Sequence, residues 1–292
     1  MAKARALDRR RKSIRSIRKI TRTMELISTA RFKRAMDRAT AATAYTRRIT
    51  ALVRHLAHNG LEVTHPLLQD RPEPKRALLL VLAANRGLCA GYNGNIVRLA
   101  SARCKELRGT VPEVRLEVAG KRGISAFRFR KNPPDESFTH FEDKPSFVEV
   151  DVLASRYLAD FVAGKLDRLD VVYTKFESAS RQQAVVETLL PLGGLEGVDE
   201  ESAATEPQYE FLPSAKSILD EVVPTSFKVK LFKCFLDAAV SEQIARMVAM
   251  KAATENADGM ISQLSMSYNR ARQGQITNEL LEIIGGAEAL NE

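Results

Sequence analysis

The stretch that decides the fold is TSFKVKLFKCFLDAAVSEQIARMVAMKAATENADGMISQLSMSYNRARQGQITNELLEII, residues 225–284. Its apolar side chains recur at intervals of three and four residues, or small multiples of these, which is the period of one face of an α-helix. At about 1.5 Å per residue, such a helix is roughly 90 Å long. A single helix cannot bury so long an apolar stripe, so the sequence predicts a partner helix of similar length.

The other end of the chain supplies that partner. Residues 7–59 contain no Pro and no Gly, and two columns of residues repeat there every seven positions. The first column is Leu7, Ile14, Thr21, Ser28, Ala35, Ala42, Ile49 and Leu56, and the second is Arg10, Ile17, Met24, Arg31, Arg38, Tyr45, Leu52 and Asn59. A seven-residue repeat over so many turns is typical of a left-handed coiled coil. We therefore expect a long antiparallel coiled coil of the N- and C-terminal helices; the alternative is that both belong to a helical bundle.

Between the two helices the period of the sequence changes. Apolar or alternating runs predict strands at 76–84, 114–118, 138–141, 169–176 and 184–190, separated by helical segments at about 96–107, after 120 and at 147–164. Strands that alternate with helices predict an inserted Rossmann-like α/β domain with a largely parallel sheet. The expected division of the chain is a coiled-coil helix over 1–60, an α/β domain over 75–213 and a second coiled-coil helix over 214–292.

Two local signals refine these boundaries. Ser146 followed by Glu149 has the spacing of a capping box at the start of a helix. Ser214 is expected to begin a short helix that ends at Val223, and Pro224 is expected just before the long helix or within its first turn.

Charge is concentrated at one end of the chain. Residues 1–50 hold 16 Lys and Arg against 3 Asp and Glu, whereas the remainder holds 29 against 33. A basic terminal helix on an otherwise mildly acidic protein predicts a surface for an acidic protein, nucleic acid or anionic lipid. The Arg-rich start resembles a transit peptide, but its heptads continue into the helix, which favours a structural role. The longest apolar run, Ala77–Ala84, is far shorter than the ~20 residues of a membrane span, and the three cysteines are expected to be free thiols.

Sequence motifs for nucleotide binding, catalysis and metal binding are weak in this chain. The glycine-rich turn at 87–94 follows a strand and opens a helix, where phosphates bind, but it fits neither GxGxxG nor GxxxxGK[ST]. Cys89 in this turn has no histidine near it in sequence to act as a base, and His55 with His58 alone do not make a metal site. We expect no catalytic residue, no cofactor and no metal in this chain.

The end of the long helix carries a polar cluster and resembles a known family. ITNELLEIIGGAEA at 276–289 resembles the C-terminal signature of the γ subunit of F-type ATP synthases. SEQ with ARMVAMKAAT at 241–254, KIT with ME at 19–25, and RGLCAGYN at 86–93 resemble further motifs of that family, with Ala90 in place of its usual Gly. The resemblance covers essentially the whole chain.

The resemblance implies a non-catalytic rotor. It predicts a shaft of two terminal helices inside a ring of three α and three β subunits, with the α/β domain outside the ring against ε and the c-ring. The chain would couple proton flow to ATP synthesis on the β subunits and regulate ATPase activity. It would be a peripheral protein on the cytoplasmic face of the bacterial inner membrane, with neither nucleic-acid binding nor insertion into the membrane.

The family's contacts can be carried onto this sequence. The resemblance implies that β subunits contact Arg272, Gln273, Thr277 and Glu279, with Glu282 in the same polar cluster, and Gln243, Arg246 and Met24 elsewhere on the two helices. There is no long cysteine-bearing insertion of the kind found in chloroplast γ chains, because residues 191–213 form a short acidic segment. A bacterial protein without thiol regulation is therefore expected.

Two alternative functions remain open at this stage. An α/β enzyme with helical oligomerisation arms would bind a ligand at the glycine-rich turn. A basic coiled coil that binds nucleic acid would show steep salt dependence, but aromatic residues other than Phe32 and Tyr45 are missing from its basic helix.

Overall fold

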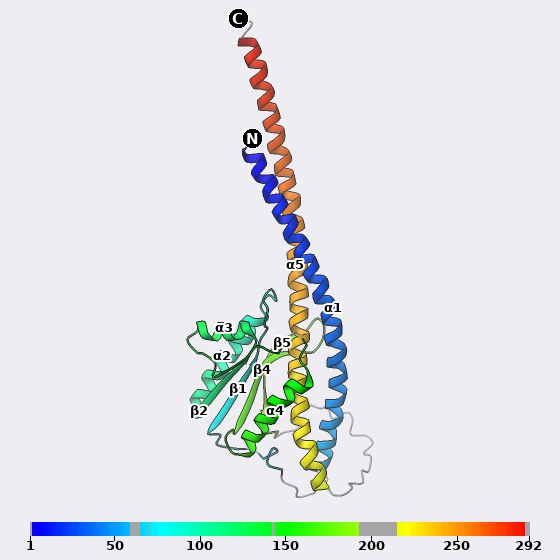
Figure 1. The fold of residues 1–292 in the computed structure, drawn as a ribbon, viewed down its shortest axis with the longest axis vertical. Helices are drawn as coiled ribbons and strands as arrows, with labels where there is room; N and C mark the ends of the chain where they lie inside the picture. The colour runs from blue at the N-terminus through cyan, green and yellow to red at the C-terminus, as the bar shows by residue number, and fades with distance from the viewer. Residues whose placement is uncertain (1, 59–64, 70, 142–143, 193–214, 290–292) are drawn as a thin grey trace. The chain divides into compact units, whose positions relative to one another are not determined.

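The computed structural model describes residues 2–58, 65–69, 71–141, 144–192 and 215–289 (Figure 1). It forms two compact units. The first, called here the helical unit, consists of Met1–Thr29 and Arg246–Glu292, and the second, the α/β unit, of Ala30–Ala245. The terminal helices α1 (Ala2–His58) and α5 (Ala215–Ala289) each contribute to both units. Although α5 is 75 residues long, no helix among the described residues is long and apolar enough to cross a membrane.

Helix α5 begins earlier than the sequence predicts. Instead of a short helix that ends at Val223 and a break at Pro224, one helix runs from Ala215 through Pro224; Ser214 lies outside the described residues. A proline inside a helix removes one hydrogen bond and costs about 3 kcal/mol. Val223 and Phe227 on either side of it are fully buried, and burying two such side chains contributes about 3–6 kcal/mol. Packing therefore outweighs the proline.

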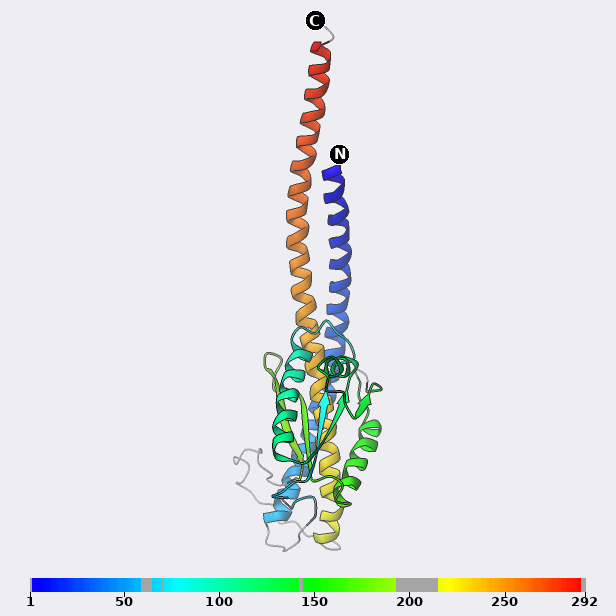
Figure 2. The same ribbon diagram turned by 90° about the vertical axis from the view of Figure 1, so that its left-hand side faces the viewer.

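Within the helical unit, α1 and α5 lie side by side (Figures 1 and 2). The hydroxyl oxygens of Thr21 and Thr254 are 2.9 Å apart. Nearer the N-terminus of α1, the guanidinium of Arg11 lies over the ring of Tyr268, 4.7 Å from its centroid. Residue numbers rise along α5 as they fall along α1, so the pair is antiparallel, and the predicted pairing of the two terminal helices is confirmed.

The two predicted columns of α1 differ in how far they are buried. Thr21 and Ser28 of the first column are buried. In the second column, Arg10 and Ile17 are exposed, whereas Met24, Arg31 and Arg38 are half-buried. The second column is therefore the less enclosed of the two. The side chains of Tyr45, Ile49, Leu52, Leu56 and Asn59, and of His55 and His58, lie outside the described residues.

The α/β unit contains one five-stranded sheet with the strand order β3-β2-β1-β4-β5. The strands are β1 (Arg76–Leu82), β2 (Glu113–Ala119), β3 (Glu136–Phe138), β4 (Arg168–Phe176) and β5 (Gln182–Leu190). Strand β1 pairs in parallel with β2 and β4, β2 pairs in parallel with β3, and β5 pairs antiparallel to β4. The prediction of a largely parallel sheet is confirmed. The central strand is buried on both faces, as its continuous apolar run indicates.

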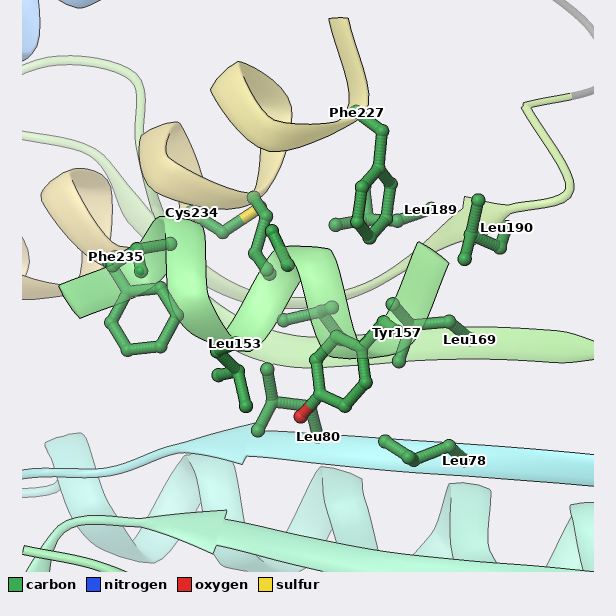
Figure 3. Close-up of a cluster of buried hydrophobic side chains, with 14 of the residues drawn as sticks. Leu78, Leu80, Leu153, Tyr157, Leu169, Leu189, Leu190, Phe227, Cys234 and Phe235 are labelled. Atoms are coloured by element: carbon green, nitrogen blue, oxygen red, sulfur yellow. The ribbon is translucent and has the colours of Figure 1, made fainter. Parts of the chain in front are cut away.

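Helices cover both faces of this sheet. One face packs against α2 (Tyr92–Thr110) and α3 (Lys121–Phe129), and its core includes Ile96 and Phe127. The other face packs against α4 (Phe147–Val162) and α5. Figure 3 shows this second core, in which Tyr157 of α4 lies beside Leu80 of β1 and Leu169 of β4, and Phe227 of α5 lies beside Leu189 of β5. A third, smaller cluster packs Ala35 and Ala39 of α1 against α5.

Two other local predictions within the α/β unit are confirmed. The Ser146 hydroxyl accepts a bond from the Glu149 backbone N–H at 3.3 Å, and the Glu149 carboxylate accepts one from the Ser146 N–H at 3.1 Å. The predicted capping box is therefore confirmed. Cys89, Cys104 and Cys234 are free and buried, and burial raises the pKa of the Cys234 thiol, so this residue is an inert thiol rather than a nucleophile.

The Thr21–Thr254 pair generates a test of the seam between the helices. We expect Thr254→Val to lower the free energy of unfolding by about 1 kcal/mol, the usual contribution of one buried hydrogen bond. The cost stays small because the Thr21 hydroxyl keeps its bond to the Arg18 carbonyl. With Thr21→Val added, the facing positions are both apolar and most of that loss is recovered. Urea unfolding of the four proteins in this double-mutant cycle measures the coupling.

An exposed threonine provides the control for that cycle. Thr29 bonds only the Glu25 carbonyl of its own helix, so Thr29→Val is expected to change stability by less than about 0.5 kcal/mol. Strictly additive effects of Thr21→Val and Thr254→Val would show that the two hydroxyls do not interact.

Candidate partner-binding surface

The last turns of α5 form the most exposed surface of the helical unit. Every residue from 276 to 287 is exposed, and the exposed set includes the aliphatic side chains of Ile276, Leu280, Leu281, Ile283 and Ile284. A soluble protein rarely leaves so many large apolar side chains together in water unless another molecule covers them. This end of α5 is therefore suited to an interface.

The predicted contact residues of this segment are all accessible. Arg272, Gln273, Thr277, Glu279 and Glu282 are exposed. Gln273 and Thr277 are one turn apart, and Arg272 and Glu279 are two turns apart, so the five residues occupy more than one side of the helix. The surface consequently presents different chemistry in different directions around its axis.

Two grooves run along α5 where it meets the start of α1. Arg272 and Gln275 line one groove of about 620 Å³, together with Arg5 and Arg9 of α1. Glu279 and Glu282 line a second groove of about 1240 Å³. The side-chain amide of Gln275 donates to the Glu279 carboxylate at 2.8 Å. Gln275 thus orients Glu279, a predicted contact residue. The sequence could have indicated this pair, because a Gln and a Glu four residues apart face each other on a helix.

The other three predicted residues have different surroundings. Met24 on α1 is half-buried in the helical unit. Arg246 is buried in the helical unit, and Gln243 is buried in the α/β unit. Both polar atoms of the Gln243 amide are without a hydrogen-bond partner among the described residues. Sequence reasoning placed Gln243 and Arg246 with accessible residues because it could not see what covers them.

The basic face of α1 keeps most of its charge. Two of its three acidic residues are already engaged: Asp8 pairs with Lys12 at 3.0 Å and with Arg11 at 2.6 Å, and Glu25 pairs with Arg22 at 2.9 Å. Bonds from Lys12 and Arg11 hold the pKa of the Asp8 carboxyl below its usual value. The exposed Arg and Lys residues of this helix far outnumber its acids, so it attracts an acidic partner surface.

The glycine-rich turn does not form a ligand site. It follows β1 at the carboxyl edge of the sheet, where α/β folds of this kind bind nucleotides. Helix α5 covers this edge and leaves a cavity of about 40 Å³, lined by Asn85, Tyr92, Gly120 and Phe235 among others. Such a cavity has room for water but not for a nucleotide. The geometry therefore disfavours the alternative of an α/β enzyme with its site at this turn.

Buried charges elsewhere in the α/β unit are also paired. Glu117 of β2 accepts bonds from Arg156 and from the Tyr157 hydroxyl, both at 2.6 Å. Desolvation raises the pKa of Glu117. Asp170 of β4 is fully buried and bonds Arg103 at 2.7 Å. These groups hold α4 and α2 to the sheet, and no group of three or more His, Cys, Asp or Glu in the described ranges is arranged to hold a metal ion.

Comparison with known proteins covers the whole chain. The family model described as ATP synthase matches residues 3–290. An ATP synthase gamma chain of Rhodopirellula baltica is 63% identical over 295 residues, which cover 99% of each chain. An ATP synthase gamma chain of Leptospira biflexa is 39% identical over 291 residues, which cover 100% of each chain.

Solved structures share the fold at low identity. A chain of the Euglena gracilis mitochondrial ATP synthase, in a structure of OSCP, F1 and c-ring, has a TM-score of 0.64 and 20% identity over 99% of this chain and 95% of that chain. A chain from the central stalk and c-ring structure of the Tetrahymena thermophila mitochondrial enzyme has a TM-score of 0.57 and 17% identity, over 80% and 99%. Taken with the sequence relatives, these findings establish that the chain belongs to the ATP synthase family, as one of its gamma chains.

Proposed function

We propose that this chain is the central rotor shaft of an F-type ATP synthase, which couples proton flow to ATP synthesis on the β subunits and regulates ATPase activity. The observation that carries the proposal is the antiparallel helix pair of the helical unit, whose exposed end differs in chemistry from one side to another. The full-length gamma-chain relative at 63% identity supports it. The chain itself performs no catalysis.

The proposed partners are those that membership of the gamma-chain family implies. The terminal helices, 1–60 and 214–292, turn inside the ring of α and β subunits, and the α/β domain, 75–213, lies against ε and the c-ring. The assembly is peripheral, on the cytoplasmic face of the bacterial inner membrane. Neither nucleic acid nor the lipid interior is a partner of this chain.

The proposed contact with β consists of Arg272, Gln273, Thr277, Glu279 and Glu282 on α5, with Met24 on α1. These side chains are exposed or half-buried, and they lie on several sides of the helix pair. Gln243 and Arg246 join the contact where a partner displaces the residues that cover them.

The free energy of a few polar contacts is enough to shift a β subunit between two conformational states. A ligand or partner that moves a two-state equilibrium from 1:99 to 99:1 must favour one state by about 5.5 kcal/mol. A hydrogen bond to a charged group contributes about 1.5–3 kcal/mol, so about two to four such bonds are enough. A group such as Arg272 with Gln273 and Thr277 can be exchanged in steps as the shaft turns, whereas a large complementary apolar interface would hold it at one angle. Each β subunit then responds to the angle because it meets a different side of the shaft.

Observing rotation tests the proposal directly. We expect a bead attached to the α/β unit to rotate in one direction when this chain is assembled with its α and β subunits and supplied with ATP. A correctly assembled complex that hydrolyses ATP while the bead shows only undirected fluctuation would refute the shaft function.

The contact residues generate a second test. In the assembled enzyme, we expect Arg272→Ala with Gln273→Ala to lower the rate of ATP synthesis by about tenfold or more, because losing one charge-assisted bond costs at least about 1.4 kcal/mol. The unfolding midpoint of the isolated chain should not change, since both side chains are exposed. Arg270→Ala with Gln263→Ala is the matched control, because this Arg and Gln are exposed on the same helix and are not in the proposed contact. Unchanged synthesis in the first variant would remove these two residues from the contact.

The basic face of α1 generates a third test. Arg15→Gln with Lys19→Gln removes two exposed positive charges one turn apart. We expect slower assembly with the α and β subunits at low ionic strength and wild-type rates near 1 M salt, where charges are screened beyond about 3 Å. Arg98→Gln with Lys105→Gln on α2 removes the same charge from the α/β unit and should leave the assembly rate unchanged. Equal slowing by both pairs would indicate an effect of net charge rather than of α1.

A further inference from the structure

The glycine-rich turn has no part in the function proposed above, yet the fold maintains strain there. Leu88 and Ala90 have φ angles of 63° and 46°, in the left-handed region that side chains disfavour. Each such residue costs roughly 1–2 kcal/mol. Strained positions persist where the surrounding structure enforces them, and they cluster at functional sites. The cavity beside this turn is too small for a nucleotide, but the turn positions residues that contact other elements of the fold.

The glycine-rich turn places Tyr92 in contact with helix α5. Asn93 pins the turn to the sheet, because its side-chain oxygen accepts a bond from the Ala84 backbone N–H at 3.0 Å. This places the first residue of α2, Tyr92, under α5. The buried Tyr92 hydroxyl donates to the Ala238 backbone carbonyl of α5 at 3.1 Å.

A second bond ties α5 to the sheet close to the first. The Ser241 hydroxyl donates to the Thr174 carbonyl near the end of β4 at 3.2 Å. Ala238 and Ser241 are three residues apart and therefore share one side of α5. In the first bond Tyr92 of α2 donates to α5, and in the second Ser241 of α5 donates to β4.

These bonds lie where α5 is most enclosed. All residues from 234 to 244 are buried, between the sheet on one side and α1 on the other. The close-packed side chains around this part of α5 already resist its movement, and hydrogen bonds add a directional restraint to that packing. Hydrogen bonds weaken steeply when their angles change. Two of them, at different points of one helix face, resist both rotation about the helix axis and sliding along it.

We propose that Tyr92 and Ser241 form a torque-bearing joint that locks the sheet of the α/β unit to α5. The inference rests on the proposed rotor function and goes beyond it by naming the residues through which twisting force enters the long helix. It also assigns a purpose to the strained turn, which is to hold Tyr92 against the Ala238 carbonyl. Tyr92 and Ser241 are positioning residues, because neither contacts a nucleotide or a proton-carrying group.

The test measures twisting stiffness in the assembled enzyme. With the ring fixed to a surface and a bead on the α/β unit, the angular fluctuation of the bead during catalytic pauses reports the stiffness of the rotor. We expect Tyr92→Phe with Ser241→Ala to raise the angular variance about twofold, because both directional bonds are lost while the apolar packing stays. The direction of rotation and the number of steps per turn should not change.

Three variants separate a joint from a general loss of stability. Tyr157→Phe removes another buried tyrosine hydroxyl, one that bonds Glu117 rather than α5, and should leave the variance at the wild-type value. Ser241→Thr on the Tyr92→Phe background keeps one bond and should give an intermediate variance. Ala90→Gly relieves strain without removing Tyr92, so it should raise the unfolding temperature and leave the variance unchanged.

The outcomes are distinguishable. Wild-type variance in the Tyr92→Phe, Ser241→Ala enzyme, or an equal increase in Tyr157→Phe, overturns the joint while the rotor function stands. If the double variant does not assemble, hydrogen exchange of the two single variants replaces the bead measurement: faster exchange confined to 234–244 and the end of β4 supports the joint, and unchanged or uniformly faster exchange overturns it. A wild-type complex that shows no rotation refutes the proposed function itself.

Discussion

The structure depends on the need of one long helix to cover its apolar stripe. Helix α5 presents apolar residues at helical intervals over most of its length, and each stretch is satisfied by a different neighbour. In the α/β unit, the sheet and α1 cover it from two sides. In the helical unit, α1 pairs with it in antiparallel orientation. The chain meets this need by bringing its two ends together and placing the whole sheet between them in sequence.

Polar groups give this pairing its precision. The seam of the helical unit contains Thr21, Ser28 and Thr254, small side chains that add little hydrophobic stabilisation but let the backbones approach. A misaligned pair would lose the bond between the buried Thr21 and Thr254 hydroxyls, at a cost of about 1 kcal/mol, while each hydroxyl keeps its bond to a carbonyl of its own helix. This bond therefore adds a modest preference for the observed register.

Local patterns predicted much of the fold. The apolar run of β1, the capping box at Ser146 and the long periodic stretch of α5 are governed by neighbours within a few turns, and all three agree with the structure. The degree of burial along α1 was not predictable in the same way, because a seven-residue repeat does not distinguish the exposed Ile17 from the half-buried Met24. Likewise, Pro224 stays inside a helix because of burial by distant residues, which a local rule does not include.

In the candidate site, too, local sequence predicted some features, whereas contacts with distant residues determine others. The exposed positions at the end of α5 could be recognised from short motifs, and their accessibility follows from the absence of further chain to cover them in the described structure. The burial of Gln243 and the enclosure of residues 234–244 arise from contacts with strands and helices far away in sequence. The Tyr92–Ala238 bond joins residues 146 positions apart, and no pattern within either segment indicates the other.

The uncovered end of α5 has a consequence for how the protein is made. The segment from Ile276 onward is the exposed end of α5 and is rich in aliphatic side chains. A newly synthesised chain without a partner therefore exposes an apolar segment, and contact between two such segments promotes aggregation. Prompt burial of this segment by a partner would therefore protect a newly made chain from aggregation.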